Sequence, residues 1–205
     1  MSGGFNFQYD LEILQHPDRA RMCGFGDKDR RPIDPPPVLK LISNSQTHAA
    51  EMACQKFVVF CDIFGVQENH PDLPPTEEPM SLVSQQSTEQ MVPNLVGTTA
   101  ATAHYFKSID PQQEAILFVF PELSVRIEGT FRLRFTLFPG IGDESCIHSS
   151  VIKFSKPFRS YSPKNFPGML ASSELSKSLA NQGIKINTRS GSDPNIIVPD
   201  TNPSD

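Results

Sequence analysis

The chain has 205 residues, a length that fits one domain with a tail and can bury a hydrophobic core without disulfides or a structural metal. Its formal net charge of −5 excludes a uniformly basic nucleic-acid binder. The charge is unevenly spread, however. Residues 57–106 hold six acidic residues and no Lys or Arg, whereas residues 126–189 hold ten cations and four acidic residues. A local basic face is therefore compatible with the acidic total.

The first element expected in chain order is a strand over residues 5–13. Apolar residues occupy every odd position from Phe5 to Ile13, and polar residues occupy the positions between them. Alternation with a period of two is typical of a strand that buries one face, so one side of this segment is expected in the core.

The next segment, residues 19–37, combines cations, glycines and prolines. Its five cations are Arg19, Arg21, Lys28, Arg30 and Arg31. Two central glycines permit unusual backbone conformations, and the prolines from Pro32 onward cannot donate to a β-ladder. The pattern predicts an ordered loop that displays guanidinium groups, which suit phosphate oxygens and guanine edges. Alternatively, Asp27 and Asp29 pair locally with the cations, and the segment is only a solvated charged loop.

Six further strands are expected, at residues 38–42, 57–64, 116–120, 130–137, 146–154 and 157–161. The segments 57–64 and 116–120 are apolar on both faces, so both are expected to be central strands. Seven short strands with turn signals between them predict a mainly β fold, an antiparallel β-sandwich.

Residues 130–137 alternate clearly. Phe131, Leu133, Phe135 and Leu137 are expected in the core. Arg132 and Arg134 are expected on the opposite face of the strand.

One C-terminal helix is expected. Ser172 or Ser173 can cap its N-terminus, Leu175 and Leu179 share one face, and Gly183 ends it. Residues 67–93 contain several prolines, serines and glutamines and predict a long, partly disordered loop. Residues 190–205 predict a disordered tail, which leaves one domain over residues 1–189.

Catalytic chemistry is not indicated. The four cysteines, Cys23, Cys54, Cys61 and Cys146, have no metal-ligand or redox spacing and are expected to be reduced thiols, mostly buried. The five histidines are scattered, and no nucleophile elbow or phosphate-binding loop occurs. The sequence therefore predicts no enzyme activity, no metal and no cofactor, and no membrane segment. A β-sandwich enzyme or carbohydrate binder is a further alternative.

Residues 19–37 and three later blocks resemble, in order, the velvet family of fungal regulators. These blocks are residues 118–135, 162–169 and 173–183, so the resemblance extends over nearly the whole chain, from about residue 5 to residue 189. It implies an immunoglobulin/Rel-like sandwich in which the loop after the first strand contacts DNA. On this basis a DNA role is expected for Arg19, Arg21, Lys28, Arg30 and Arg31.

The resemblance also implies a function. Velvet proteins are nuclear, sequence-specific transcription regulators of spore development and secondary metabolism that act as homodimers or heterodimers, and the subfamily stays open here. Lys185 and Arg189 follow the helix and are placed to add phosphate contacts to double-stranded DNA. Arg19 and Arg21 lie near a strand end and have a second interpretation, namely bracing of the loop.

The partner surface is the least constrained expectation. Phe166, Met169 and Leu170 are expected to form an exposed apolar contact with another velvet protein, or else to seat the helix on the sandwich. An alternative function is an adaptor that does not bind DNA and modulates a velvet partner by dimerising with it.

Overall fold

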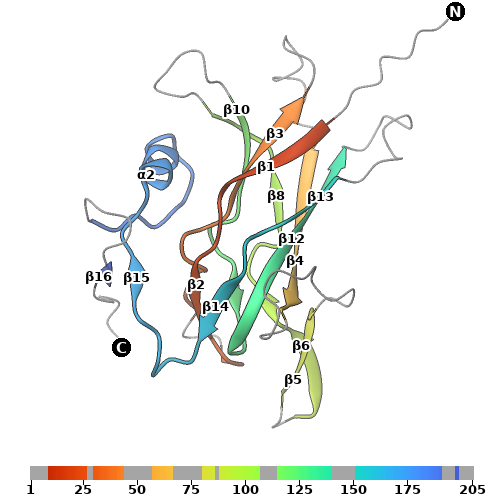
Figure 1. The fold of residues 1–205 in the computed structure, drawn as a ribbon, viewed down its shortest axis with the longest axis vertical. Coiled ribbons are helices and arrows are strands. Elements are labelled where there is room, and N and C mark those ends of the chain that lie inside the picture. The colour runs from red at the N-terminus through yellow and green to blue at the C-terminus, as the bar shows by residue number, and fades with distance from the viewer. Residues whose placement is uncertain are drawn as a thin grey trace, which may run out of the picture.

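The computed structural model describes residues 9–26, 30–43, 57–66, 80–85, 88–106, 115–139, 151–190 and 197–198. These residues form a mainly β fold with one short C-terminal helix among the described parts of the chain (Figure 1). Two sheets provide most of the structure, and the helix lies beside one of them.

The smaller of the two main sheets has the strand order β1-β3-β10-β9. Its strands are β1 (Tyr9–Gln15), β3 (Val38–Ser43), β10 (Ala115–Val119) and β9 (His104–Phe106), all paired antiparallel. The alternation that predicted β1 is confirmed in its described part, because Leu11 is buried between the exposed residues Asp10 and Glu12. The predicted central position of residues 116–120 is also confirmed.

The larger sheet has the strand order β2-β14-β12-β4-β8, with β13 paired to the other half of β12. The strands are β2 (Arg19–Arg21), β14 (Phe158–Tyr161), β12 (Gly129–Pro139), β4 (Phe57–Gly65), β8 (Ala100–Thr102) and β13 (Val151–Phe154). Strand β2 runs parallel to β14, so the prediction of a purely antiparallel fold is wrong at this edge. The described part of the predicted strand 146–154 is β13 alone.

One hydrophobic core joins the two main sheets. Phe131, Leu133, Phe135 and Leu137 of β12 are all at most 2% exposed, which confirms the predicted register of this strand. They share a cluster with Leu11, Leu39 and Leu41 from the smaller sheet and with Val59, Cys61 and Ile63 of β4. Burial of aromatic and branched side chains from both sheets supplies the main stabilisation of the fold.

The helix α2 (Glu174–Asn181) covers the outer face of the smaller sheet. Its Leu179 is fully buried against Val38, Leu117 and Val119, with Leu175 packed alongside. Ser173 is the N-cap, since its side chain accepts a hydrogen bond from the backbone N–H of Ser176. At the C-terminus Gly183 has φ +89°, and the backbone N–H groups of residues 183 and 184 bond to the carbonyls of residues 180 and 179. The predicted helix and its stop signal are therefore confirmed.

Three small two-stranded sheets complete the described structure. The pair β5 (Leu82–Gln85) and β6 (Gln90–Pro93) forms a hairpin that projects from the lower end of the molecule in Figure 1. The other pairs are β7 (Leu95–Val96) with β11 (Ser124–Val125), and β15 (Met169–Leu170) with β16 (Ile197–Val198). The hairpin replaces part of the loop predicted over residues 67–93, and β16 lies within the predicted tail.

The described thiols are buried. Cys23 and Cys61 are buried thiols that form no disulfide, and burial raises the pKa of the Cys61 thiol well above its ordinary value. A thiol that stays protonated is a poor nucleophile, so Cys61 serves as a small core residue. Cys54 and Cys146 lie outside the described residues.

Candidate nucleic-acid interface

The basic segment begins as a strand rather than as a loop. Arg19 and Arg21 lie in β2, whose partner β14 aligns Arg159 with Arg19 and Tyr161 with Arg21. The backbone of Arg19 also exchanges two hydrogen bonds with Asp34, of 2.9 and 2.8 Å, in an isolated antiparallel bridge. This bridge joins the two ends of the basic segment and thereby forms the neck of the loop.

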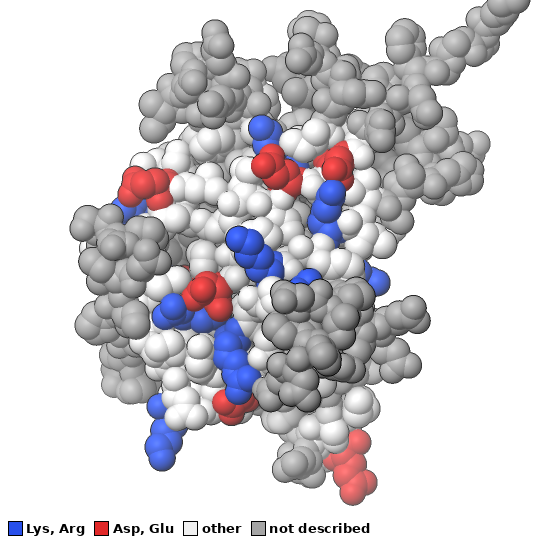
Figure 2. Space-filling view, in the orientation of Figure 1, with Lys and Arg blue, Asp and Glu red and all other residues white. Residues whose placement is uncertain are grey.

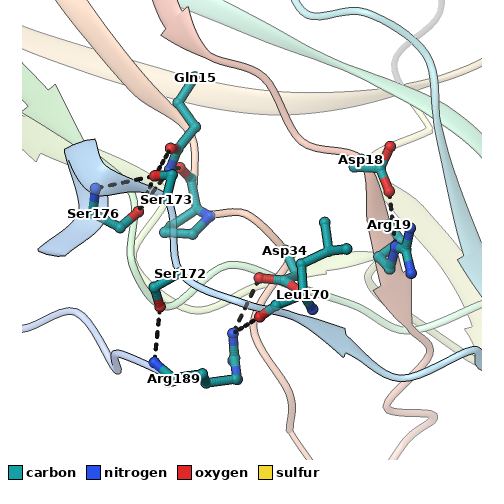
Figure 3. Close-up of polar contacts among 10 residues, drawn as sticks. Gln15, Asp18, Arg19, Asp34, Leu170, Ser172, Ser173, Ser176 and Arg189 are labelled. Carbon is teal, nitrogen blue, oxygen red and sulfur yellow. Dashed lines mark hydrogen bonds and ion pairs between the residues drawn. The ribbon is translucent and has the colours of Figure 1, made fainter. Parts of the chain in front are cut away.

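The side chain of Arg19 forms an ion pair within the chain. Its Nε donates to Oδ2 of Asp18 at 2.8 Å, and only 18% of the side chain is exposed (Figure 3). Both the bracing interpretation of Arg19 and its DNA contact stay predictions. Arg21 is half-buried on the same strand.

Arg126 holds the outgoing side of the loop, and the sequence did not indicate this role. Its Nη1 donates to the carbonyl of Gly24 at 2.9 Å, and its Nε donates to the carbonyl of Pro93 at 2.8 Å. Its guanidinium lies 5.9 Å from the ring centroid of Phe25. In return, the backbone N–H of Gly24 donates to the carbonyl of Arg126 at 3.0 Å. Gly24 has φ +63°, a conformation that the glycine in the sequence pattern anticipated.

The returning side of the loop is attached to the same segment of the chain. The hydroxyl of Ser124 donates to the carbonyl of Arg31 at 2.8 Å, and the N–H of Ile33 donates to the carbonyl of Leu123 at 2.6 Å. Residues 123–126 therefore fix both sides of the loop. Arg30 is exposed and Arg31 is half-buried. Lys28, a predicted contact residue, lies outside the described residues together with Asp27 and Asp29.

Arg189 lies against the buried carboxylate of Asp34. Its Nη1 is 3.2 Å from Oδ1 of Asp34 and 3.4 Å from the carbonyl of Leu170, while its N–H bonds to the hydroxyl of Ser172 (Figure 3). The side chains of Arg189 and Asp34 are 23% and 4% exposed. Arg189 therefore forms an internal ion pair, and the phosphate contact expected at this residue stays a prediction. Lys185, the other predicted residue after the helix, is exposed.

Asp34 is an unusual carboxylate. Burial raises its pKa above the ordinary value, although the hydrogen bond from the backbone of Leu170 and the nearby charge of Arg189 act in the opposite direction. Asp34 thus connects the neck of the loop with β15 and with the segment after α2. Neighbouring polar contacts join the end of β1 to the helix, because Gln15 bonds to Ser173 and Ser176.

The predicted partner residues are not an exposed patch. Met169 and Leu170 are 3% and 9% exposed and pair with β16, and Phe166 packs its ring 6.3 Å from that of Tyr161. The prediction of an exposed apolar contact is wrong for Met169 and Leu170. The strand β16, with which they pair, lies almost thirty residues further along the chain.

The described part of the face shown in Figure 2 has no continuous basic patch, because acidic groups lie close to several of its basic groups. Ion pairs among the described residues include Arg159 with Glu128 at 3.8 Å and Arg134 with Asp62 at 2.7 Å. Among the described residues no cluster of His, Cys, Asp or Glu could hold a metal ion, and no helix in that part of the chain is long and apolar enough to cross a membrane.

Comparison with known protein families gives one match that covers most of the chain. The model of the family described as "Velvet factor" matches residues 9–73 and 65–193. The chain belongs to the velvet family. The resemblance inferred from the four sequence blocks is thereby confirmed, and the velvet family consists of regulatory proteins rather than enzymes.

Individual velvet relatives are similar over about nine-tenths of this chain. The "Spore development regulator RYP2" of Ajellomyces capsulatus is 35% identical over 191 residues, which cover 88% of this chain and 43% of the relative. The "Developmental and secondary metabolism regulator veA" of Emericella nidulans is 33% identical over 213 residues, which cover 91% of this chain and 36% of the relative. The "Velvet complex subunit 2" of Gibberella moniliformis is 30% identical over 279 residues, which cover 91% of this chain and 62% of the relative. This velvet chain therefore spans less than two thirds of each of these relatives.

Proposed function

We propose that this chain is a nuclear, sequence-specific DNA-binding regulator of spore development and secondary metabolism, acting as a homodimer or heterodimer with another velvet protein. Family membership and the printed names of the relatives support the regulatory part of the proposal. The name of the third relative, a velvet complex subunit, supports assembly with velvet partners. An immunoglobulin/Rel-like relation of the two main sheets belongs to the same proposal.

The observation that carries the DNA-binding part is the anchoring of the basic segment. The bridge between Arg19 and Asp34 closes its neck, and residues 123–126 hold both of its sides by backbone and side-chain hydrogen bonds. Because the described parts of the segment are held in this way, Arg30 and Arg31 can bind with little loss of conformational entropy, which favours readout of a defined surface such as a DNA groove. Lys28, Arg30 and Arg31 are the proposed contacts, and Lys185 is a further one.

The salt dependence of binding to duplex DNA tests this proposal. If the three loop cations each neutralise one phosphate, they contribute roughly −2.7 to the slope of log affinity against log salt concentration. Replacement of Lys28, Arg30 and Arg31 by Ala should flatten the slope by about that amount. The melting temperature should stay close to that of the wild type, because solvated loop charges add little stability. Replacement of three cations outside the loop, Lys153, Lys156 and Lys177, provides the matched control.

Single substitutions separate positioning from readout. If Arg30 or Arg31 grips a guanine edge, its Ala variant should lose about 1–3 kcal/mol on the preferred sequence and much less on random DNA. The preferred sequence is obtained by selection from a random pool, with the chain alone and with velvet partners. A residue that only contacts phosphate should weaken both DNAs equally.

A second candidate function is an adaptor that dimerises with another velvet protein and does not bind DNA itself. Two observations favour it. The net charge is −5, and the side chains of Arg19 and Arg189 form ion pairs within the chain, with Asp18 and with the buried Asp34. Unchanged affinity and salt slope in the folded triple variant would remove the loop from the DNA interface and leave the adaptor as the better interpretation.

A further inference from the structure

The outer face of the larger sheet carries large apolar side chains that its fold does not need. In β4 and β12, Val59, Cys61, Leu133 and Phe135 point into the core, so the alternate residues point outward. Four of the outward residues, on three adjacent strands, are exposed: Phe60 by 46%, Phe138 by 47%, Ile152 by 46% and Phe154 by 36%. These four residues are named the aromatic sheet face.

The pairing register places these side chains next to one another. Thr136 of β12 lies opposite Phe60 on one side and Ile152 on the other. The rings of Phe60 and Phe138 meet edge to face with centroids 5.3 Å apart, and Phe154 meets Phe64 in the same way at 5.5 Å. Since a Phe side chain has about 150–250 Å² of surface, the four residues expose roughly 350 Å². The largest apolar patch on an ordinary monomer is about 300–600 Å² and often has a function, so this patch is a candidate for an interaction surface.

The two main sheets differ in how their outer faces are covered. The smaller sheet also has apolar residues on its outer face, Val38, Leu117 and Val119, and helix α2 covers them. No helix in the described part of the chain covers the aromatic sheet face in the same way. The strand β4 is central, as expected, since it lies between β12 and β8, yet its Phe60 is exposed. An outer sheet face normally carries polar residues when it meets only water.

Two charged residues next to the aromatic sheet face indicate which partner covers it. Arg134 and Asp62 lie side by side among the rings, with Nη2 and Oδ2 2.7 Å apart and with 30% and 40% of each side chain exposed. The guanidinium of Arg134 also lies 4.8 Å from the ring centroid of Phe64. This surface therefore carries one positive and one negative charge among apolar side chains. When two copies are related by a two-fold rotation, each Arg134 can face the Asp62 of the other copy, so the surface is complementary to itself. A polyanion is not favoured by such a balanced surface.

We propose that two copies of this chain pack face to face through the aromatic sheet face. This inference rests on the dimeric part of the proposed function and names its surface. The exposed apolar area is somewhat under half of the about 800 Å² that each partner contributes to a standard interface, so surrounding polar side chains supply the rest. The face lies on the half of β12 that pairs with β13, whereas the half that pairs with β14 leads to β2 and the basic loop. Both loops of the dimer therefore stay accessible to DNA.

Sedimentation velocity over a concentration series, without DNA, tests the proposal on the full chain. The wild type should show a concentration-dependent dimer. Phe60→Ser and Phe138→Ser should each weaken self-association at least about tenfold, because each removes a large apolar side chain from the interface. Met91→Ser is the matched control, since Met91 is 58% exposed on the hairpin and outside the aromatic sheet face. Thermal unfolding of every variant establishes that it is folded.

Charge reversal tests the two-fold arrangement. Arg134→Asp and Asp62→Arg should each weaken self-association, because like charges then face each other, and an equimolar mixture of the two variants should restore the dimer. The double variant Arg134→Asp/Asp62→Arg keeps the internal pair and should dimerise like the wild type, so it covers the case in which a single variant fails to fold.

Three outcomes would overturn the inference. They are a wild type that stays monomeric at tens of micromolar, Phe60 and Phe138 variants that associate like the wild type, and a chain that binds only a different velvet protein. Salt-dependent DNA binding is measured on the same preparations. A monomer that binds DNA through the basic loop would refute the interface and leave the DNA-binding proposal standing, and a dimer without DNA binding would do the reverse.

Discussion

Replacement of Arg189 by Ala offers a direct test of the internal ion pair that connects the end of the domain with the neck of the basic loop. Asp34 is 4% exposed and would lose the cation whose Nη1 lies 3.2 Å from its Oδ1. Removing one partner of a buried pair leaves an uncompensated charge and typically costs 3–5 kcal/mol. Because 23% of Arg189 is exposed, water offsets part of this loss, and we expect the free energy of unfolding to fall by about 3 kcal/mol at pH 7.

The pH dependence of that loss identifies its cause. The pKa of Asp34 is already raised by burial, and removal of Arg189 takes away one of the influences that lower it. A carboxylate with a raised folded-state pKa contributes stability that is present below its unfolded value of 3.8 and is lost as the pH rises through the folded value. The difference between the Arg189→Ala variant and the wild type should therefore be largest at neutral pH and shrink as the pH falls toward 4.

Urea unfolding of both proteins at several pH values between 4 and 7 measures this difference. Lys185→Ala, at an exposed cation four residues earlier, is the matched control and should change stability by less than about 0.5 kcal/mol. Equal, small losses for both variants at every pH would refute the internal pair. In that case Arg189 would be available for the phosphate contact that its position in the sequence predicted.

Four further substitutions test the core, a backbone contact and the loop attachment. Phe135→Ala should cost about 3–5 kcal/mol in chemical unfolding and Arg132→Ala under about 1, whereas equal losses would mean that the register of β12 is wrong. Gly97→Ala should cost about 2 kcal/mol or more in thermal unfolding, because φ is +106° and the new Cβ would lie 1.9 Å from the carbonyl oxygen of Glu122. Arg126→Ala should speed amide hydrogen exchange near the base of the loop roughly tenfold, since it removes two charge-assisted hydrogen bonds; unchanged exchange there would remove Arg126 from the attachment.

Local patterns account for what the sequence could predict. The alternation along β1 and β12 fixed which side chains enter the core, because a strand places successive residues on opposite faces. The helix was predictable from its cap, its two leucines and its terminating glycine, all within about a dozen residues. These features depend on neighbours in the chain, and the structure agrees with them.

Features that depend on distant residues were not predictable in the same way. The parallel pairing of β2 with β14 joins segments about 140 residues apart, and it turned the start of a predicted loop into an edge strand. Asp34 and Arg189 are separated by 155 positions, so nothing near Arg189 in the sequence indicated a buried partner. The hairpin β5–β6 was missed for a different reason, because exposed Leu82 and Met91 break the usual pattern of polar residues on the water-facing side.

The contacts around Asp34 attach the basic segment to the rest of the domain. Its backbone closes the neck of the loop through Arg19, and its carboxylate accepts hydrogen bonds from the backbone of Leu170 and from Arg189. One buried residue therefore ties the loop to β15 and to the segment that follows α2. Any change that frees this carboxylate should loosen the neck as well as lower stability, since backbone and side chain belong to the same residue. If the basic segment reads DNA, the C-terminal segment then contributes to affinity without touching DNA, by holding the neck of the loop in place.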